Sequence, residues 1–278
     1  MGSARRRGDA KTLFDVGNSG RQIGGCVDEM VNMKVLAHGG TSEPDKLEGM
    51  AQTPEDATGP IPTIGTGPKV AFLGLGVMGA PMASHLAKAD YQITVYNRSA
   101  PKALAWVALN RGFAKPTPVE AVEYADFVMM CVGNDDDLAD VVLGPTGVFT
   151  ALKPGATFID HTTVSARIAR QIAVEARDLE VHCVDAPVTG GQAGAENGQL
   201  TVMCGGRADA IEAARPIMEA YTKRIVHVGK AGAGQTTKMV NQIAFSGILA
   251  TLSEALRFAE AAHLDLDKVY EAISGGAS

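Results

Sequence analysis

Three glycines at a fixed spacing point most directly to a bound ligand. Gly74, Gly76 and Gly79 form G-x-G-x-x-G immediately after the apolar run 70–73 and at the start of a predicted helix. In such a loop the first glycine permits a tight turn, the second lets the backbone approach a pyrophosphate, and the third lets the helix pack against the strand. Amide groups at a helix start bind phosphate, so the loop predicts a dinucleotide site. The other residues of this loop are Leu75, Val77 and Met78.

The residues after the next predicted strand, 91–96, bear on which dinucleotide is bound. An NAD enzyme usually has Asp or Glu about 20 residues after the glycines, where it binds the ribose 2′-hydroxyl. This chain has Asn97, Arg98 and Ser99 there instead. A guanidinium group pairs with the 2′-phosphate of NADP, which a carboxylate would repel. We therefore expect NADP as cofactor rather than NAD. The alternative is that Arg98 is an ordinary solvated arginine at a strand end.

The composition excludes several other classes of protein. The 278 residues are 46% hydrophobic and carry a net charge of −6 without a basic stripe, so we expect neither nucleic-acid binding nor membrane attachment. No apolar run reaches the roughly 18 residues of a membrane span. The histidines and the four separated cysteines lack metal-ligand spacing, which predicts no metal site. Free thiols of this kind favour a reducing, cytoplasmic location.

Residues 1–68 differ from the rest of the chain. They are rich in Gly, Pro, Ser, Thr and acidic residues, so a disordered extension is expected. The alternative is that translation begins later, at Met33 or Met50. From Lys69 strands and helices alternate, which predicts an α/β fold of Rossmann type, with a doubly wound, mostly parallel sheet. The predicted strands are 69–74, 91–96, 126–132, 156–160, 181–185, 199–204 and 225–228, and the predicted helices are 77–89, 100–111, 165–179 and 207–220.

The last part of the chain follows a different pattern. Residues 199–204 come after a glycine-rich loop that is too short for a helix, so we expect an antiparallel edge strand there. After Gly229, apolar residues recur at helical spacing through about 30 residues. A helix of that length spans about 45 Å, and it is expected to link two domains. A second helix is expected from Leu266 to the glycines 275–276.

Four segments of the chain, taken in their order, resemble those of a known protein family. They are Gly74-Leu-Gly-Val-Met-Gly-Ala-Pro-Met-Ala83, Asp160-His-Thr-Thr163, Asp185-Ala-Pro-Val-Thr-Gly-Gly191 and Gly232-Ala-Gly-Gln-Thr-Thr-Lys-Met-Val-Asn-Gln242. With them the chain resembles the β-hydroxyacid dehydrogenase family, which includes 3-hydroxyisobutyrate dehydrogenase and tartronate semialdehyde reductase and is related to 6-phosphogluconate dehydrogenase. The resemblance implies an NADP-binding Rossmann domain over 69–229. It also implies that 230–278 begin a helical substrate and dimerisation domain, truncated at Ser278.

The resemblance also implies a proton donor. Lys238 matches the catalytic lysine of the family, which would protonate the carbonyl oxygen as hydride arrives and accept that proton in the reverse direction. Asn241 and Gln242 follow at positions i+3 and i+4, on the same helix face, and are expected to orient the substrate. Without the resemblance, Lys238 would be an ordinary solvated lysine of an amphipathic helix.

Two further loops match the family. Thr189, Gly190 and Gly191 match the loop that holds the substrate carboxylate, where two glycines can present amide groups to an anion. Thr163 matches a residue beside the nicotinamide. The alternatives are a plain turn for the first loop and a helix cap for Thr163. The segment expected to pass the cofactor ribose is Val132, Gly133 and Asn134.

The sequence leaves two hypotheses of different class. The first is an NADP-dependent oxidoreductase that interconverts a short 3-hydroxy acid and its semialdehyde, acting as a homo-oligomer through the helical region. The second is an NADP-binding fragment or interaction module without turnover, because the family's helical domain extends beyond Ser278. An imine reductase of related fold is disfavoured because those enzymes generally replace the lysine. His85 is a departure, since the family often has Asn at that position, and it predicts a modest change in packing or capping.

Overall fold

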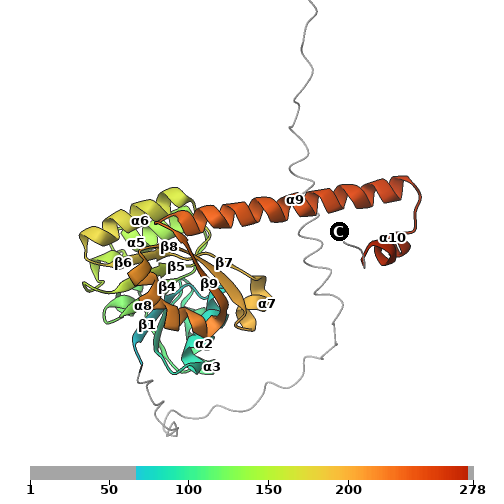
Figure 1. Cartoon of the computed structure of the whole chain (residues 1–278). Coiled ribbons are helices and arrows are strands. Elements are labelled where there is room, and N and C mark those ends of the chain that lie inside the picture. The colour runs from blue at the N-terminus through green and yellow to red at the C-terminus, as the bar shows by residue number, and fades with distance from the viewer. Residues whose placement is uncertain (1–66, 275–278) are drawn as a thin grey trace, which may run out of the picture. The chain divides into compact units, whose positions relative to one another are not determined.

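The computed structural model describes residues 67–274. Figure 1 shows a β-sheet with helices packed on it and one long helix that extends from it. The extension predicted for residues 1–68 lies outside the described residues as far as residue 66. The strands are β1 (Lys69–Leu73), β2 (Gln92–Tyr96), β3 (Phe113–Ala114), β4 (Phe127–Met130), β5 (Thr157–Asp160), β6 (His182–Asp185), β7 (Val188–Thr189), β8 (Leu200–Gly206) and β9 (Thr222–Gly229).

The helices alternate with these strands until the last strand, after which the chain is helical. They are α2 (Gly79–Lys88), α3 (Ala100–Leu109), α4 (Pro118–Val122), α5 (Asp135–Leu143), α6 (Ala166–Asp178), α7 (Gly191–Glu196), α8 (Ala208–Met218), α9 (Ala233–Ala261) and α10 (Leu266–Ile273), with the 3-10 turns η1 (Val148–Thr150) and η2 (Glu219–Tyr221).

The sheet has the predicted doubly wound topology. Its strand order is β3-β2-β1-β4-β5-β6-β8-β7, and β9 pairs with β8. The strands from β1 to β6 pair in parallel, while β8 is antiparallel to β6 and β7. The order reverses between β1 and β4, and ligands of such sheets bind at the carboxyl ends of the strands at this point. The fold therefore places the glycine loop, which follows β1, at the switch point.

Helices cover both faces of the sheet, which explains the continuous apolar runs of its strands. Within β1, Val70 and Phe72 point into a core formed with α2, α3 and α8. The alternate residues Ala71 and Leu73 point into a second core, formed with α4, α5 and α6. Side chains of a strand alternate between its faces, so each residue of β1 packs against one helical layer or the other.

Two details of the prediction for residues 199–204 were wrong. Strand β8 is antiparallel, as expected, but it is not an edge strand, because β9 pairs with it in parallel. The preceding loop also holds a helix, since α7 forms over Gly191–Glu196. Its six residues fit because the chain turns sharply at Gly190 and Gly191, whose φ angles are 131° and 63°. The short elements β3, β7, α4 and η1, and the longer helix α5, were not predicted.

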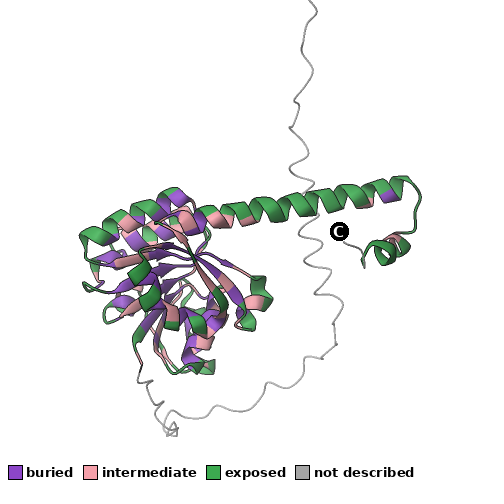
Figure 2. Cartoon of the chain, viewed as in Figure 1, coloured by how far each residue is buried: buried purple, intermediate pink, exposed green. Residues whose placement is uncertain are grey.

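The long helix α9 has the predicted length, 29 residues. Its first turns pack against β8, β9 and α6, whereas its later turns are mostly exposed, as the green ribbon in Figure 2 shows. Helix α10 packs against α9 near its end, where Ala259 is buried. Within residues 67–274, no helix has both the length and the apolar character needed to cross a membrane.

Candidate active site

The glycine loop has the backbone geometry that its spacing predicts. Gly74 has a φ of 97°, and a Cβ there would collide with the carbonyl oxygen of Cys131 at the end of the neighbouring strand. A Cβ at Gly79 would collide with the carbonyl oxygen of Gly74. A Cβ at Gly76, in contrast, would meet no atom within 4 Å, so the space in front of this backbone is free for a ligand. The loop and the first turn of α2 therefore fit a pyrophosphate.

A pocket of about 440 Å³ lies beside this loop, at the carboxyl ends of β1, β2 and β4. Most of the residues predicted to bind the cofactor line it, including Arg98 and Ser99 after β2. Its full lining is Leu73, Gly74, Gly76, Val77, Met78, Gly79, Tyr96, Asn97, Arg98, Ser99, Lys102, Cys131, Val132, Gly133, Asp137 and Val141.

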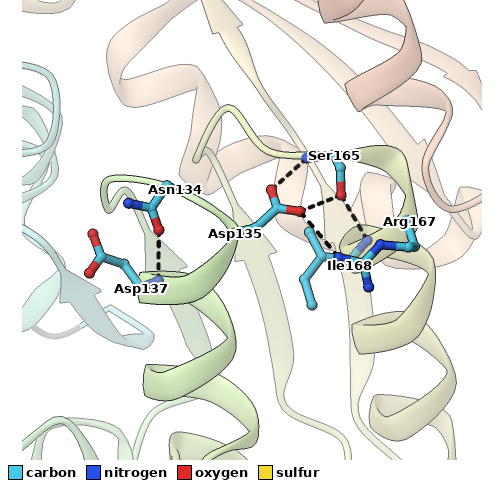
Figure 3. Close-up of polar contacts among 6 residues, drawn as sticks. All are labelled: Asn134, Asp135, Asp137, Ser165, Arg167 and Ile168. Atoms are coloured by element: carbon cyan, nitrogen blue, oxygen red, sulfur yellow. Dashed lines mark hydrogen bonds and ion pairs between the residues drawn. The ribbon is translucent and has the colours of Figure 1, made fainter.

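Three residues of the predicted cofactor set lie outside this lining. Thr163 lines a second pocket, described below, whereas Leu75 and Asn134 support the first pocket. Leu75 is buried in the core, and its amide donates to Asn97 Oδ1 at 2.9 Å. Asn97 thus fixes the glycine loop to the end of β2. The side chain of Asn134 caps α5, because its Oδ1 accepts from the Asp137 amide at 2.9 Å (Figure 3).

Helix α5 is also tied to the loop that follows β5. The Asp135 carboxylate accepts hydrogen bonds from the amide and the hydroxyl of Ser165, and Arg167 lies 3.8 Å from it (Figure 3). Burial alone would raise the pKa of Asp135, but these contacts outweigh it and lower that pKa. Asp135 is therefore charged at neutral pH, and it fixes the N-terminus of α6.

A second pocket of about 630 Å³ adjoins the first, and the two share Met78, Cys131, Val132 and Gly133. It brings together every residue predicted to bind substrate, although these residues come from two separate parts of the chain. Its remaining lining residues are His161, Thr162, Thr163, Val188, Thr189, Gly190, Gly191, Lys238, Asn241, Gln242 and Phe245.

The carboxylate of Asp185 positions the helix that carries Lys238. It accepts hydrogen bonds from the Gly232 amide at 2.7 Å and the Gln235 amide at 3.0 Å, at the start of α9. Burial raises the pKa of Asp185, and these amide hydrogen bonds oppose that rise. The first turn of α9 approaches β8 so closely that position 234 requires glycine, because a Cβ there would collide with the carbonyl oxygen of Met203. Lys238 lies one turn further along, half-buried, and burial lowers its pKa.

A layer of buried polar groups lies behind the second pocket. Asp160 is 3% exposed, and its Oδ1 accepts from the Thr162 amide at 2.9 Å. Burial raises the pKa of Asp160 to about 7, against the hydrogen bonds from Thr162 and with a further rise from the Asp185 charge. Burial lowers the pKa of His161 to about 4, so the ring is neutral. Its Nδ1 donates to the Ala186 carbonyl oxygen, and its Nε2 accepts from the Tyr221 hydroxyl.

Several residues of the site were missed by sequence reasoning. Lys102 and Asp137 line the first pocket, while Asp185 and Gln235 hold α9 in place. Lys102 follows Arg98 by four residues and could have been found from that spacing. The role of His85 also became visible only in the structure, where its Nε2 lies 3.1 and 3.0 Å from the carbonyl oxygens of Ala195 and Glu196 at the end of α7.

Metal ligation has no basis in this part of the chain. No group of three or more His, Cys, Asp or Glu side chains within residues 67–274 could hold a metal ion. Cys131, Cys183 and Cys204 are free thiols, and burial raises the pKa of Cys131 to about 12, with Asp160 adding to the rise. This thiol therefore stays protonated at neutral pH.

The joined pockets at the switch point of a doubly wound sheet define the class of an NAD(P)-binding oxidoreductase. Residues 69–229 match the family described as NAD binding domain of 6-phosphogluconate dehydrogenase. Residues 232–278 match the family described as NAD-binding of NADP-dependent 3-hydroxyisobutyrate dehydrogenase. The chain belongs to the β-hydroxyacid dehydrogenase family, as its motifs predicted.

Individual relatives agree with this assignment. An uncharacterized oxidoreductase of Shewanella frigidimarina is 51% identical over 210 residues, which cover 76% of this chain and 72% of the relative. The probable 3-hydroxyisobutyrate dehydrogenase-like 2 of Arabidopsis thaliana is 39% identical over 211 residues, covering 76% and 70%. Among solved structures, 3-hydroxyisobutyrate dehydrogenase of Mycobacterium tuberculosis with L-serine has a TM-score of 0.70 and 31% identity, covering 76% of this chain and 71% of that chain.

Proposed function

We propose that this chain is an NADP-dependent oxidoreductase that interconverts a short-chain 3-hydroxy acid and its semialdehyde. The observation that carries the proposal is the second pocket. In it, Lys238 shares one cavity with the loop Thr189–Gly191, and this cavity adjoins the glycine-loop pocket. A proton donor, an anion-binding loop and a cofactor pocket are the three parts that such a reaction requires.

In this proposal the substrate carboxylate binds to the loop Thr189–Gly191. Its hydroxyl and backbone amide groups are the donors available to an anion there, and Gly190 and Gly191 have positive φ angles at the start of α7. The carboxylate then holds the rest of a small substrate against α9, where Asn241 and Gln242 line the same cavity. The hydroxyl or carbonyl group of the substrate is thereby placed beside Lys238.

NADPH, when bound, supplies a hydride to the carbonyl carbon, and NADP accepts one from the alcohol in the reverse direction. Lys238 donates the proton in one direction and accepts it in the other. During reduction its ammonium group protonates the carbonyl oxygen, and during oxidation its neutral amine removes the hydroxyl proton. Burial lowers the pKa of Lys238, which brings the neutral amine closer to the working pH.

The preference for NADP rests on cations in the first pocket. Arg98 and Lys102 line it at the end of β2 and the start of α3. The position after β2 that favours NAD when it is acidic holds Asn97 here, and its Oδ1 is already engaged by the Leu75 amide. A 2′-phosphate would therefore meet positive charge, with a planar guanidinium available for two parallel hydrogen bonds.

Two measurements test this function. Titration with NADPH and NADH is expected to show tighter binding of NADPH, and Arg98→Ala is expected to remove most of that preference. Equal affinities in the unsubstituted chain would refute the cofactor assignment. A panel of small aldehyde acids is then assayed for NADPH consumption. Lys238→Ala should abolish turnover and retain cofactor binding, and undiminished turnover would show that another group supplies the proton.

The homo-oligomer is a second part of the proposal. Beyond its first turns α9 carries large apolar side chains that are mostly exposed, and such a surface in water favours association. We place a domain division near residue 230, with this helix in the assembling part. Light scattering on a size-exclusion column should give a mass above that of one chain, and a monomer at high concentration would exclude assembly through α9. The exposed apolar side chains of α9 include Val240, Ile243, Phe245, Ile248, Leu252 and Phe258.

A further inference from the structure

Asp137 is the acidic side chain among the residues that line the first pocket. It comes from the first turn of α5, across the pocket from the loop after β2. Its Oδ1 lies 3.1 Å from Arg98 Nη1, so carboxylate and guanidinium form an ion pair between segments that are 39 residues apart in sequence. The residue proposed to bind the 2′-phosphate is therefore already paired with a carboxylate.

The two partners of this ion pair differ in how firmly they are held. The side chain of Arg98 is 87% exposed, whereas that of Asp137 is 32% exposed. The carboxylate also lies over the backbone of the loop after β4, because a Cβ at Gly133 would collide with Asp137 Oδ2. In addition, the Asp137 amide is fixed by the Asn134 cap (Figure 3). Asp137 is thus the fixed partner, and Arg98 is the partner that can turn toward a ligand.

We propose that Asp137 determines how strongly the site discriminates between NADP and NAD. A 2′-phosphate has to take Arg98 away from Asp137, and it is also repelled by the carboxylate that remains in the same pocket. NAD, with a neutral 2′-hydroxyl, meets neither penalty. This inference rests on the proposed NADP preference and deepens it, since it predicts that the preference is smaller than the cations Arg98 and Lys102 alone would give.

The expected size follows from the exposure of the pair. An exposed ion pair contributes little in water, and a like charge several ångströms away adds a comparable repulsion. Replacement of Asp137 by Asn should therefore tighten NADP binding by about 3- to 10-fold, with NAD binding changed by less than about 2-fold. Both effects are electrostatic, so added salt should reduce the difference.

The chain offers a matched control on the same helical turn. Asp136 is exposed and does not line the pocket, yet it carries the same charge at the N-terminus of α5. Asp136→Asn removes one negative charge from the same helix end, and so reproduces any effect of net charge or of the helix dipole. The quantity to compare is the ratio of the dissociation constants of NAD+ and NADP+, measured by calorimetry on the full chain at low and high salt.

A rise of this ratio in Asp137→Asn that is absent in Asp136→Asn supports the proposal. Equal ratios in the two variants, or weaker NADP+ binding in Asp137→Asn, overturn it. Comparison of Arg98→Ala with the double variant Arg98→Ala/Asp137→Asn separates the two contributions. In a chain without Arg98 there is no ion pair to break, so Asp137 affects NADP+ binding only through repulsion. Arg98→Ala shows separately whether the proposed NADP preference is wrong. In that case the ratio of dissociation constants in Arg98→Ala would equal that of the unsubstituted chain, whatever the effect of Asp137→Asn.

Discussion

The side-chain amide of Gln235 donates to the carbonyl oxygen of Thr162 at 2.6 Å. Through its Oε1 the same side chain accepts from the Val164 amide at 3.1 Å, and it has no exposed surface. One buried amide therefore joins the helix of Lys238 to the loop that leads from β5 into the second pocket. This contact fixes Lys238, the proposed proton donor, relative to the loop containing Thr163.

Replacement of Gln235 by Leu is expected to lower the free energy of unfolding by about 2–4 kcal/mol, because one buried donor and one buried acceptor lose their partners. Urea denaturation measures this change, and the slope with denaturant should stay constant if the native fold is kept. Gln199→Leu is the control, since Gln199 is exposed. A similar stability for both variants would show that the Gln235 contacts are dispensable.

Asp160 is expected to make stability depend on pH. Its pKa is about 7 in the folded chain and near 3.8 in the unfolded chain. Between these values the folded state binds a proton that the unfolded state lacks, so stability falls as pH rises from about 4 to about 7 and then levels off. The loss is on the order of 4 kcal/mol at most, because one pKa unit corresponds to about 1.36 kcal/mol.

Asp160→Asn should remove this dependence, because an amide does not titrate. Unfolding free energies at pH 5 and pH 8 test it: the drop between the two should be smaller in the variant than in the unsubstituted chain. Asp140→Asn serves as the exposed control on α5 and should leave the drop unchanged. An identical drop in all three chains would mean that Asp160 is ionised throughout.

The fold was largely predictable because its signals are local. The apolar runs, the glycine spacing after β1 and the helical period of α9 each lie within one short segment. The short elements β3, β7 and α7 were missed because two to six residues carry no period. Helix α5 received no bounds from the sequence, although its first three residues, Asp135 to Asp137, are acidic and suit the positive end of a helix.

The sequence predicted residues that line the two pockets, but it did not predict the contacts that hold these residues in place. The family motifs contain Lys238 and the loop Thr189–Gly191, and these residues do share one pocket. The contact of Gln235 with Thr162 joins residues 73 apart, and that of Arg98 with Asp137 joins residues 39 apart. No local pattern encodes such pairs, because they arise only when the sheet brings strand ends together.

His85 is expected to affect substrate binding more than cofactor binding. It lies on α2, and its Nε2 contacts the carbonyl oxygens that end α7, the helix that begins within the loop Thr189–Gly191. His85→Ala should loosen α7. A hydrogen bond contributes about 0.5–1.5 kcal/mol, so the KM of the acid substrate should rise by about 2- to 10-fold.

The dissociation constant of NADPH should change little in the same variant, which provides an internal control. His85→Asn tests whether a shorter side chain can reach the same carbonyl oxygens, and its substrate KM is expected to fall between those of the unsubstituted chain and His85→Ala. If the affinity for NADPH drops as much as that for substrate, His85 supports α2 and the glycine loop instead of α7.

The pH dependence of turnover should report Lys238. Oxidation needs the neutral amine, so its rate should rise with pH through the pKa of Lys238. Reduction needs the ammonium group, so its rate should fall through the same value. Burial lowers that pKa from the ordinary lysine value of 10.5. Both limbs are therefore expected at a lower pH than a solvated lysine would give, and they should coincide in measurements of kcat/KM.

Lys238→Arg tests this assignment while retaining the positive charge. A guanidinium group stays protonated throughout the accessible range, so the rising limb of oxidation should vanish, and the rate should fall by about 100-fold or more. NADPH binding should be retained, which separates lost chemistry from lost folding. If the limb persists at the same pH in Lys238→Arg, the titrating group is another residue of the pocket, and Lys238 acts there only through its charge.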